Sequence, residues 1–290
     1  MMTFQVRHET TYAYDRPVRF GPHRLMVRPR DGHDMRVLDS SLSIAPRATV
    51  RWAYDTFGNS VALLTFPEPA SILSVRSALT VRRYGYDDPL TSLSPHGGAY
   101  PFAYDPDELI DLAPLMRPEH PADRPALEGW LADLRHAPPP GTMPLLDELV
   151  RRVHGGFAYA RREARGVQPP ARTIALGRGT CRDFALLFIE AARHLGFAAR
   201  FVSGYLYDGA AAGSAQVEGG GATHAWADVF VPGAGWIEFD PTNRIIAGRN
   251  LLRVATTRTP SQALPLSGTY VGPGAEFLGM DVAVSVTRTD

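Results

Sequence analysis

Cys181 is the only cysteine among the 290 residues and the side chain with the clearest potential for nucleophilic chemistry. It lies in GRGTCRDFALLF (177–188), which opens with two glycines and continues into an apolar run. Thr180 and Asp183 have the spacing of a capping box, which predicts that a helix begins at Cys181. Unpaired N–H groups and the helix dipole at that end favour the thiolate, the nucleophilic form. Because Gly179 has no side chain, a substrate carbonyl could approach the same N–H groups.

A lone cysteine in a helix is more often a small buried residue than a nucleophile, so its partners decide between these readings. A thiol nucleophile needs a base, and the base needs a group that orients it. In HAWADVFV (224–231) and GWIEFD (235–240), period-two alternation puts His224 and Asp240 on matching faces of two predicted strands. A hairpin with its loop at 231–233 would place them directly opposite each other. We therefore predict a catalytic Cys-His-Asp constellation.

Other features near these residues have weaker implications. Tyr159 and Trp226 could line a substrate groove, although aromatic residues at such positions more often belong to a core. The Gly- and Ala-rich stretch 210–223 precedes the histidine and is expected to be a mobile loop that covers or admits a substrate. The acidic stretch DPDELID (105–111) does not match an EF-hand loop and is expected to be a solvated turn. The sequence therefore implies neither a metal nor a cofactor.

The elements that must position these residues follow from the hydrophobic patterning. Over residues 1–85, short alternating runs separated by Pro, Gly and Asp predict an antiparallel β domain, with a hairpin tip at 57–60. Residues 86–140 are rich in Pro and weakly periodic apart from a short possible helix at 125–137, which predicts a connector wrapped on the surface. Residues 141–290 contain an amphipathic helix at 143–157, the helix at the cysteine, and then strands that continue to the C-terminus. The predicted fold class is α+β.

Composition argues against several kinds of partner. The 30 basic and 30 acidic residues balance to a formal net charge of +0, which argues against nucleic acid or an anionic membrane surface as a partner. The chain starts without an apolar leader, has no segment of membrane-spanning length, and cannot form an intrachain disulfide with one cysteine. We expect a cytoplasmic protein, and the sequence leaves the oligomeric state open. Every basic residue is Arg, which codon usage in a GC-rich genome explains without a function.

These segments resemble the transglutaminase-like superfamily of papain-like fold, in its bacterial branch with an N-terminal β domain. That family's motifs are Gly-x-Cys-x-Asp-Phe-Ala, His-Ala-Trp and Gly-Trp-x-x-Phe-Asp-Pro-Thr-Asn, and this chain has all three. The resemblance implies that Cys181 is the nucleophile, His224 the base and then acid, and Asp240 the orienting residue. The chain departs from the pattern at Asp228, where Glu is usual, and at Asn250, where a Gly-Arg-Asp segment is usual.

Three functions remain open at this point. The first is a thiol hydrolase that cleaves amide or peptide bonds through an acyl-enzyme, with a peptide or protein as its substrate. The second is a protein-glutamine acyltransferase, in which an amine takes the place of water. The third is a non-catalytic binding module. An intact set of three catalytic residues argues against the binding module, and analogy with similar bacterial proteins favours hydrolysis.

Overall fold

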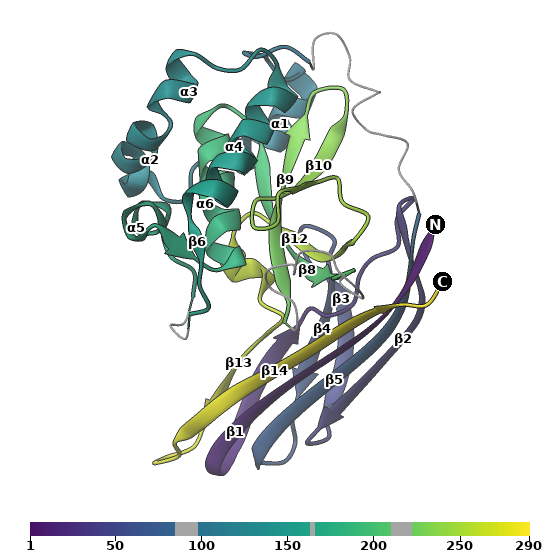
Figure 1. Cartoon of the computed structure of the whole chain (residues 1–290). Helices are drawn as coiled ribbons and strands as arrows, with labels where there is room; N and C mark the ends of the chain where they lie inside the picture. The colour runs from purple at the N-terminus through teal and green to yellow at the C-terminus, as the bar shows by residue number, and fades with distance from the viewer. Residues whose placement is uncertain (85–97, 163–165, 210–221) are drawn as a thin grey trace.

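The computed structural model describes residues 1–84, 98–162, 166–209 and 222–290 and has two packed parts (Figure 1). A sheet of long antiparallel strands forms one part, and a second sheet covered by helices forms the other. The first sheet contains β1 (Met2–Leu25), β2 (Met35–Ala45), β3 (Thr49–Tyr54), β4 (Ser60–Thr65), β5 (Ala70–Arg83), β13 (Leu266–Val271) and β14 (Phe277–Arg288). The second contains β8 (Ala199–Leu206), β9 (His224–Val231), β10 (Gly235–Asp240), β11 (Ile245–Ile246) and β12 (Leu251–Thr257).

The α-helices lie between β5 and β8 along the chain. They are α1 (Pro106–Met116), α2 (Arg124–Trp130), α3 (Ala132–His136), α4 (Thr142–Gly156), α5 (Pro170–Leu176) and α6 (Cys181–His194), with 3-10 turns at Pro121–Asp123 and Pro260–Ala263. A short parallel pair is formed by β6 (Ala158–Tyr159), which precedes α5, and β7 (Arg178–Gly179), which comes just before α6. The α+β class and the N-terminal antiparallel sheet are therefore confirmed.

The N-terminal sheet has the strand order β2-β5-β1-β4-β3. Alternate residues of β1 and β5 are buried, as expected for strands with one covered face. The predicted hairpin tip lies between β3 and β4, where Gly58 has a φ of 74° and Asp55 accepts hydrogen bonds from the backbone N–H groups of Phe57 and Asn59. The sequence pattern thus located this hairpin correctly.

The C-terminal strands differ from the expectation. We assigned them to the 141–290 core, but β13 and β14 pair with β1 and belong to the N-terminal sheet. The two ends of the chain consequently lie side by side, with the Thr289 N–H donating to the Thr3 carbonyl at 2.9 Å (Figure 1). An alternating pattern identifies such segments as strands. It does not specify that their partner lies at the other end of the chain, because the pattern fits the free edge of any sheet strand.

The short helix expected at 125–137 is present as α2 and α3, and the rest of the connector is more regular than predicted. The connector contains α1, α2 and α3, and the stretch expected to be a solvated turn is the first part of α1. Asp105 is the N-cap and accepts from the Asp107 N–H at 2.9 Å. The acidic residues in the first turn interact favourably with the helix dipole and stabilise the helix. The acidic residues therefore have a local structural role.

The core sheet has the order β11-β10-β9-β8-β12 and packs against α6. Phe188 of α6 and Phe239 of β10 stack with ring centroids 5.5 Å apart. The predicted helix at 143–157 is α4, and its apolar stripe, which includes Leu145 and Leu149, is fully buried in the same cluster. A central helix on an antiparallel sheet thus brings the cysteine next to the strands that carry the histidine and the aspartate.

Apolar residues and ions join the two sheets. Phe4 and Leu79 of the N-terminal sheet pack against Tyr205 and Leu252 of the core sheet. Beside them lies a ring of four charged side chains, three of them buried and Arg253 partly exposed, in which Arg83 and Arg253 each contact both Asp34 and Glu238. Two members come from each part of the molecule, so the ring fixes one sheet against the other.

Candidate active site

Cys181 lies in the first turn of α6, where the sequence predicted it. Thr180 Oγ accepts from the Asp183 N–H at 3.4 Å, and the Asp183 carboxylate accepts from the Thr180 N–H at 2.9 Å, which is the predicted capping box. The cysteine is 6% exposed and belongs to the main apolar cluster. The thiol therefore lies between a helix N-terminus and the protein core.

Asp183 does more than cap the helix. Its buried carboxylate also accepts from the backbone N–H of Gln168 at 2.7 Å and from the Arg162 guanidinium at 3.0 Å. Both partners belong to the chain that leads from β6 to α5. The carboxylate consequently fixes this chain against the turn that presents Cys181, a role that the sequence motif alone did not indicate.

His224 and Asp240 lie on the same face, as predicted, but the register of the hairpin is different. The pairs are Val231 with Gly235 and Asp228 with Glu238, so the loop covers residues 232–234 instead of 231–233. The predicted pairing is therefore wrong by two residues. A slip of two keeps every side chain on its face, because side chains alternate with a period of two.

A direct hydrogen bond joins the histidine to the aspartate. His224 Nε2 lies 2.8 Å from Asp240 Oδ2, and both side chains are fully buried. Burial alone would lower the pKa of His224, but the charge and hydrogen bond of Asp240, helped by Cys181, raise it to about 10. Burial opposes ionisation of Asp240 as well, yet its pKa is lowered, mainly because of the charge of His224. Each partner thus favours the charged form of the other, which is the arrangement of an imidazolium–carboxylate pair.

The second ring nitrogen is left for the thiol. His224 Nδ1 is buried and has no partner of hydrogen-bond geometry among the described residues, although Cys181 is near enough to raise the pKa of the ring. The charged ring has an N–H on each nitrogen, so one is used by Asp240 and the other is available to the sulfur. Catalytic contacts of this kind are often loose in a free enzyme and tighten with substrate.

The turn after β10 surrounds the Asp240 carboxylate with further donors. Oδ1 accepts from the backbone N–H groups of Thr242 at 2.9 Å and Asn243 at 3.3 Å. Oδ2 accepts from the Asn243 side chain at 2.9 Å as well as from His224. The sequence reasoning gave Asn243 no role. Its position three residues after an aspartate, in a Pro-containing turn, is a signal for such side-chain-to-turn bonds.

The three candidate substrate-binding residues have different surroundings in the structure. Trp226 is fully buried and stacks on His224 at 6.0 Å, so it supports the imidazole from within the core. A Cβ on Gly179 would lie 2.9 Å from the Asp183 Cβ and 3.1 Å from a Phe184 ring atom, so this glycine permits close packing of β7 on α6. Tyr159 is half-buried beside Phe184, with ring centroids 6.4 Å apart, and neighbours the cysteine helix.

The glycine-rich stretch, possible metal ligands and possible membrane spans were the other features considered in the sequence. Most of the glycine-rich stretch 210–223 lies outside the described residues. In the described part of the chain, His, Cys, Asp and Glu side chains nowhere gather into a group of three or more that could hold a metal ion. Among the same residues, no helix has both the length and the apolarity to span a membrane.

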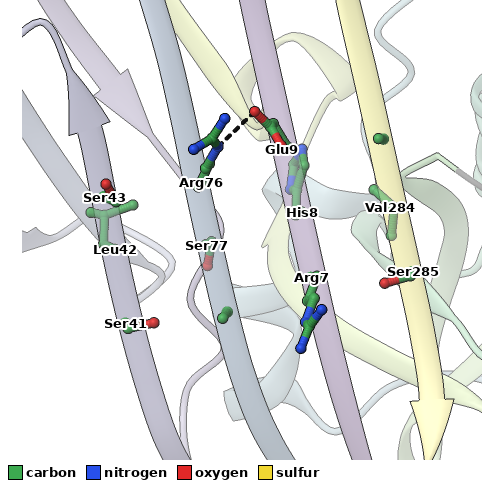
Figure 2. A pocket seen from close by; sticks show the side chains of 12 residues that line it. Arg7, His8, Glu9, Ser41, Leu42, Ser43, Arg76, Ser77, Val284 and Ser285 are labelled. Carbon is green, nitrogen blue, oxygen red and sulfur yellow. Dashed lines mark hydrogen bonds and ion pairs between the residues drawn. The ribbon is translucent and has the colours of Figure 1, made fainter.

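A hollow of about 450 Å³ lies elsewhere, on the N-terminal sheet (Figure 2). Strands β1, β2, β5 and β14 form it, and small side chains such as Ser41, Ser43 and Ser285 surround it. Arg76 and Glu9 form an ion pair at its edge, with 2.7 Å between Nε and Oε1. None of the residues that line it belongs to the Cys181 cluster.

Comparisons with known proteins agree with the two-part architecture. Residues 4–82 match the family described as the bacterial transglutaminase-like N-terminal region, and residues 139–241 match the transglutaminase-like superfamily. An uncharacterized protein of Mycobacterium tuberculosis is 28% identical over 98% of this chain and 92% of its own length. An uncharacterized protein of Mycobacterium leprae is 39% identical over 38% of each chain.

One solved structure has the same fold along the whole chain. It is a protein of Cytophaga hutchinsonii named as a candidate cysteine protease, with a TM-score of 0.74 and 22% identity. The alignment covers 100% of this chain and 92% of that one. Both parts described above therefore occur together in a second protein.

Proposed function

Because this chain belongs to the transglutaminase-like superfamily, we propose that it is a thiol-dependent hydrolase of amide or peptide bonds that acts through Cys181, His224 and Asp240. The observation that supports this most strongly is the 2.8 Å bond between His224 Nε2 and Asp240 Oδ2. It leaves Nδ1 for a cysteine that begins a helix. The superfamily membership supports cysteine-dependent acyl transfer in general, and hydrolysis is our proposal within it.

In the first half-reaction, the Cys181 sulfur attacks the carbonyl carbon of the substrate and an S–C bond forms. The C–N bond then breaks, and the imidazolium of His224 gives its Nδ1 proton to the leaving amine. The backbone N–H of Cys181 stands in the first helical turn, where N–H groups have no intrahelical partner, and would donate to the oxyanion. Asp240 keeps the ring oriented and stabilises its charge.

In the second half-reaction, the neutral His224 takes a proton from water as the oxygen attacks the acyl carbon. The C–S bond breaks, the carboxylic acid leaves, and the thiolate and imidazolium are restored. An amine in place of water would give the transferase reaction with the same residues. Whether water or an amine reaches the acyl carbon therefore decides between hydrolysis and transamidation.

Incubation with casein and a fluorescent amine tests the proposal. We expect casein fragments that increase with time in the wild type and are absent with Cys181→Ala, whose fold is checked by its thermal melting. A labelled casein band that depends on Cys181 would overturn hydrolysis and establish the transferase. If neither product forms on casein or on a panel of peptide and amide substrates, the proposal of an enzyme is wrong and the protein is a non-catalytic binding module.

The absence of lysine makes the gel pattern easier to interpret. The chain contains Arg as its only basic side chain besides His, so it cannot cross-link itself through side-chain amines. Incubation alone should yield no covalent oligomer. A ladder that forms only with a Lys- and Gln-rich acceptor protein, and disappears in Cys181→Ala, would also contradict hydrolysis.

A further inference from the structure

Asn243 is a side chain at the candidate active site that the reaction above does not use. We propose that it is a positioning residue, which acts through Asp240 to keep the carboxylate ionised and fixed against His224. This inference rests on the proposed function, because it concerns the same three residues. It adds a fourth side chain, with a testable effect on how the cysteine reacts.

The hydrogen bonds of Asp240 support this role. Its Oδ1 has two backbone donors, from Thr242 and Asn243. Its Oδ2 has two side-chain donors, from His224 at 2.8 Å and from the Asn243 carboxamide at 2.9 Å. Rotation of the carboxylate would break bonds on both oxygens at once, so this set of donors fixes its plane as well as its charge.

The carboxamide acts on the carboxylate and not on the ring. Asn243 Nδ2 lies 3.4 Å from His224 Nε2, but the two do not bond to each other, because both nitrogens are donors when the Nε2–H group donates to Asp240. They therefore converge on the same oxygen. The half-buried Asn243 is thus a second side-chain donor to Oδ2, besides His224.

The turn that carries Asn243 is held from two sides. Strand β11 pairs with the end of β10, with Asp240 opposite Ile245, so the turn is closed at its base. On its other side, His154 of α4 has its Nδ1 2.9 Å from the Thr242 carbonyl. A side chain on a turn fixed in this way can orient a catalytic carboxylate, because little freedom remains to it.

The electrostatic consequence has a definite direction. Asn243 is one of the groups that lower the pKa of Asp240, after the charge and hydrogen bond of His224. Titratable side chains that interact with the Asp240–His224 pair or its turn include Cys181 of α6 and His154 of α4. Without the carboxamide, Asp240 takes up a proton at a higher pH, and support for the imidazolium is lost sooner on acidification.

Alkylation of the single cysteine measures this without any substrate. We would follow the rate of Cys181 modification by iodoacetamide from pH 4 to 10 in the wild type, Asn243→Ala and Asn243→Asp. We expect the acid limb of the rate in Asn243→Ala to move up by about half a pH unit or more. Asn243→Asp preserves the shape of the side chain but puts a second carboxylate against Asp240. We therefore expect the acid limb to move up further in this variant than in Asn243→Ala.

Matched controls separate positioning from folding. Asn250→Ala makes the same change in a half-buried residue that donates to the Tyr207 carbonyl away from the site, and its curve should overlie that of the wild type. His224→Ala shows the result of losing the base itself. Where a substrate is known, kcat for Asn243→Ala should fall about tenfold with little change in KM.

Two outcomes would overturn the proposal. One is an alkylation curve for Asn243→Ala that overlies those of the wild type and Asn250→Ala. The other is a change in Asn243→Ala that Asn243→Asp does not share, since both substitutions remove the donor. Because alkylation needs no turnover, failure of the hydrolase proposal would appear as absent product with these curves unaffected.

Discussion

The bond between His224 and Asp240 is the feature of single residues on which the site depends most. A fully buried imidazole would ordinarily be neutral, because burial penalises its charged form. Here the adjacent carboxylate more than offsets burial, and the pKa of His224 rises to about 10. The raised pKa favours the charged ring that the proposed mechanism uses, without a contribution from a substrate.

A pH dependence of stability follows from this pair. The pKa of His224 is raised from 6.5 to about 10, so its contribution to stability is complete below pH 6.5 and is lost as pH rises towards 10. Asp240→Asn removes the partner that raises it. We therefore expect the wild type to lose more stability than Asp240→Asn between pH 6.5 and 10, as measured by urea unfolding.

The same comparison in a Cys181→Ala background removes the titration of the thiol. A difference between the two proteins that stays constant over this pH range would mean that His224 and Asp240 are not coupled as charges. Activity provides a second check, because Asp240→Asn should retain more turnover than His224→Ala: the base remains, although its orientation is weaker.

Removal of the nucleophile should separate chemistry from folding. Cys181→Ala replaces a 6% exposed residue with one of similar size in the first turn of α6. We expect turnover to disappear, while the free energy of unfolding changes by about 1 kcal/mol or less. Measured cleavage together with denaturant unfolding tests both statements, and residual Cys181-independent cleavage by purified protein would rule out the covalent route.

At the scale of elements, one turn sets the register that brings the histidine and the aspartate together. The Ala234 N–H donates to the Val231 carbonyl, and both Gly233 and Gly235 have positive φ, 81° and 78°. These angles place the bend one residue later than the sequence pattern predicted. The strands then pair two residues out of the expected register, and His224 reaches Asp240 diagonally.

Substitution of Gly235 tests how far this turn depends on its backbone. A Cβ at Gly235 meets no atom within 4 Å, so Gly235→Ala costs only the strain of a positive φ, about 1 kcal/mol. Gly155→Ala is the matched control, because its Cβ also meets no atom but the residue lies in α4. Alanine favours a helix, so the control should gain up to about 1 kcal/mol in urea unfolding. Equal changes in the free energy of unfolding for the two variants would show that the positive φ of Gly235 does not determine the cost of the substitution.

At the scale of the whole molecule, a largely buried ionic ring connects the N-terminal sheet to the strand that carries Asp240. Glu238 lies two residues before Asp240 and contacts Arg83 of β5 and Arg253 of β12. Burial raises the pKa of Glu238 to about 7 even though both arginines lower it. The carboxylate therefore depends on its partners, one of which comes from the other part of the molecule.

Removal of Arg83 should consequently be costly. Its side chain is 0% exposed, and Arg83→Ala leaves Asp34 and Glu238 buried with one arginine between them. We expect a loss of about 3 kcal/mol or more in the free energy of unfolding. Arg76→Ala, on the same strand but in an exposed pair with Glu9, should change it by about 1 kcal/mol or less. Similar losses in both variants would show that the ring does not join the two parts.

Features set by nearby residues could be predicted from the sequence. The helix start at Cys181 follows from Thr180 and Asp183, because capping bonds span three residues. The shared face of His224 and Asp240 follows from period-two alternation, which survives an error of two in register. Local rules of this kind are therefore enough to nominate the three candidate catalytic residues from the sequence.

Only the tertiary structure decided what depends on distant parts of the chain. The pairing of β13 and β14 with β1, the ring around Glu238 and the burial of Trp226 each join segments whose separation in sequence gives no local signal. The same holds for the charge of His224, since its pKa is set by a desolvated carboxylate at 2.8 Å and not by residue type. Local rules place a side chain on an element and a face, whereas packing determines its neighbours and its electrostatic environment.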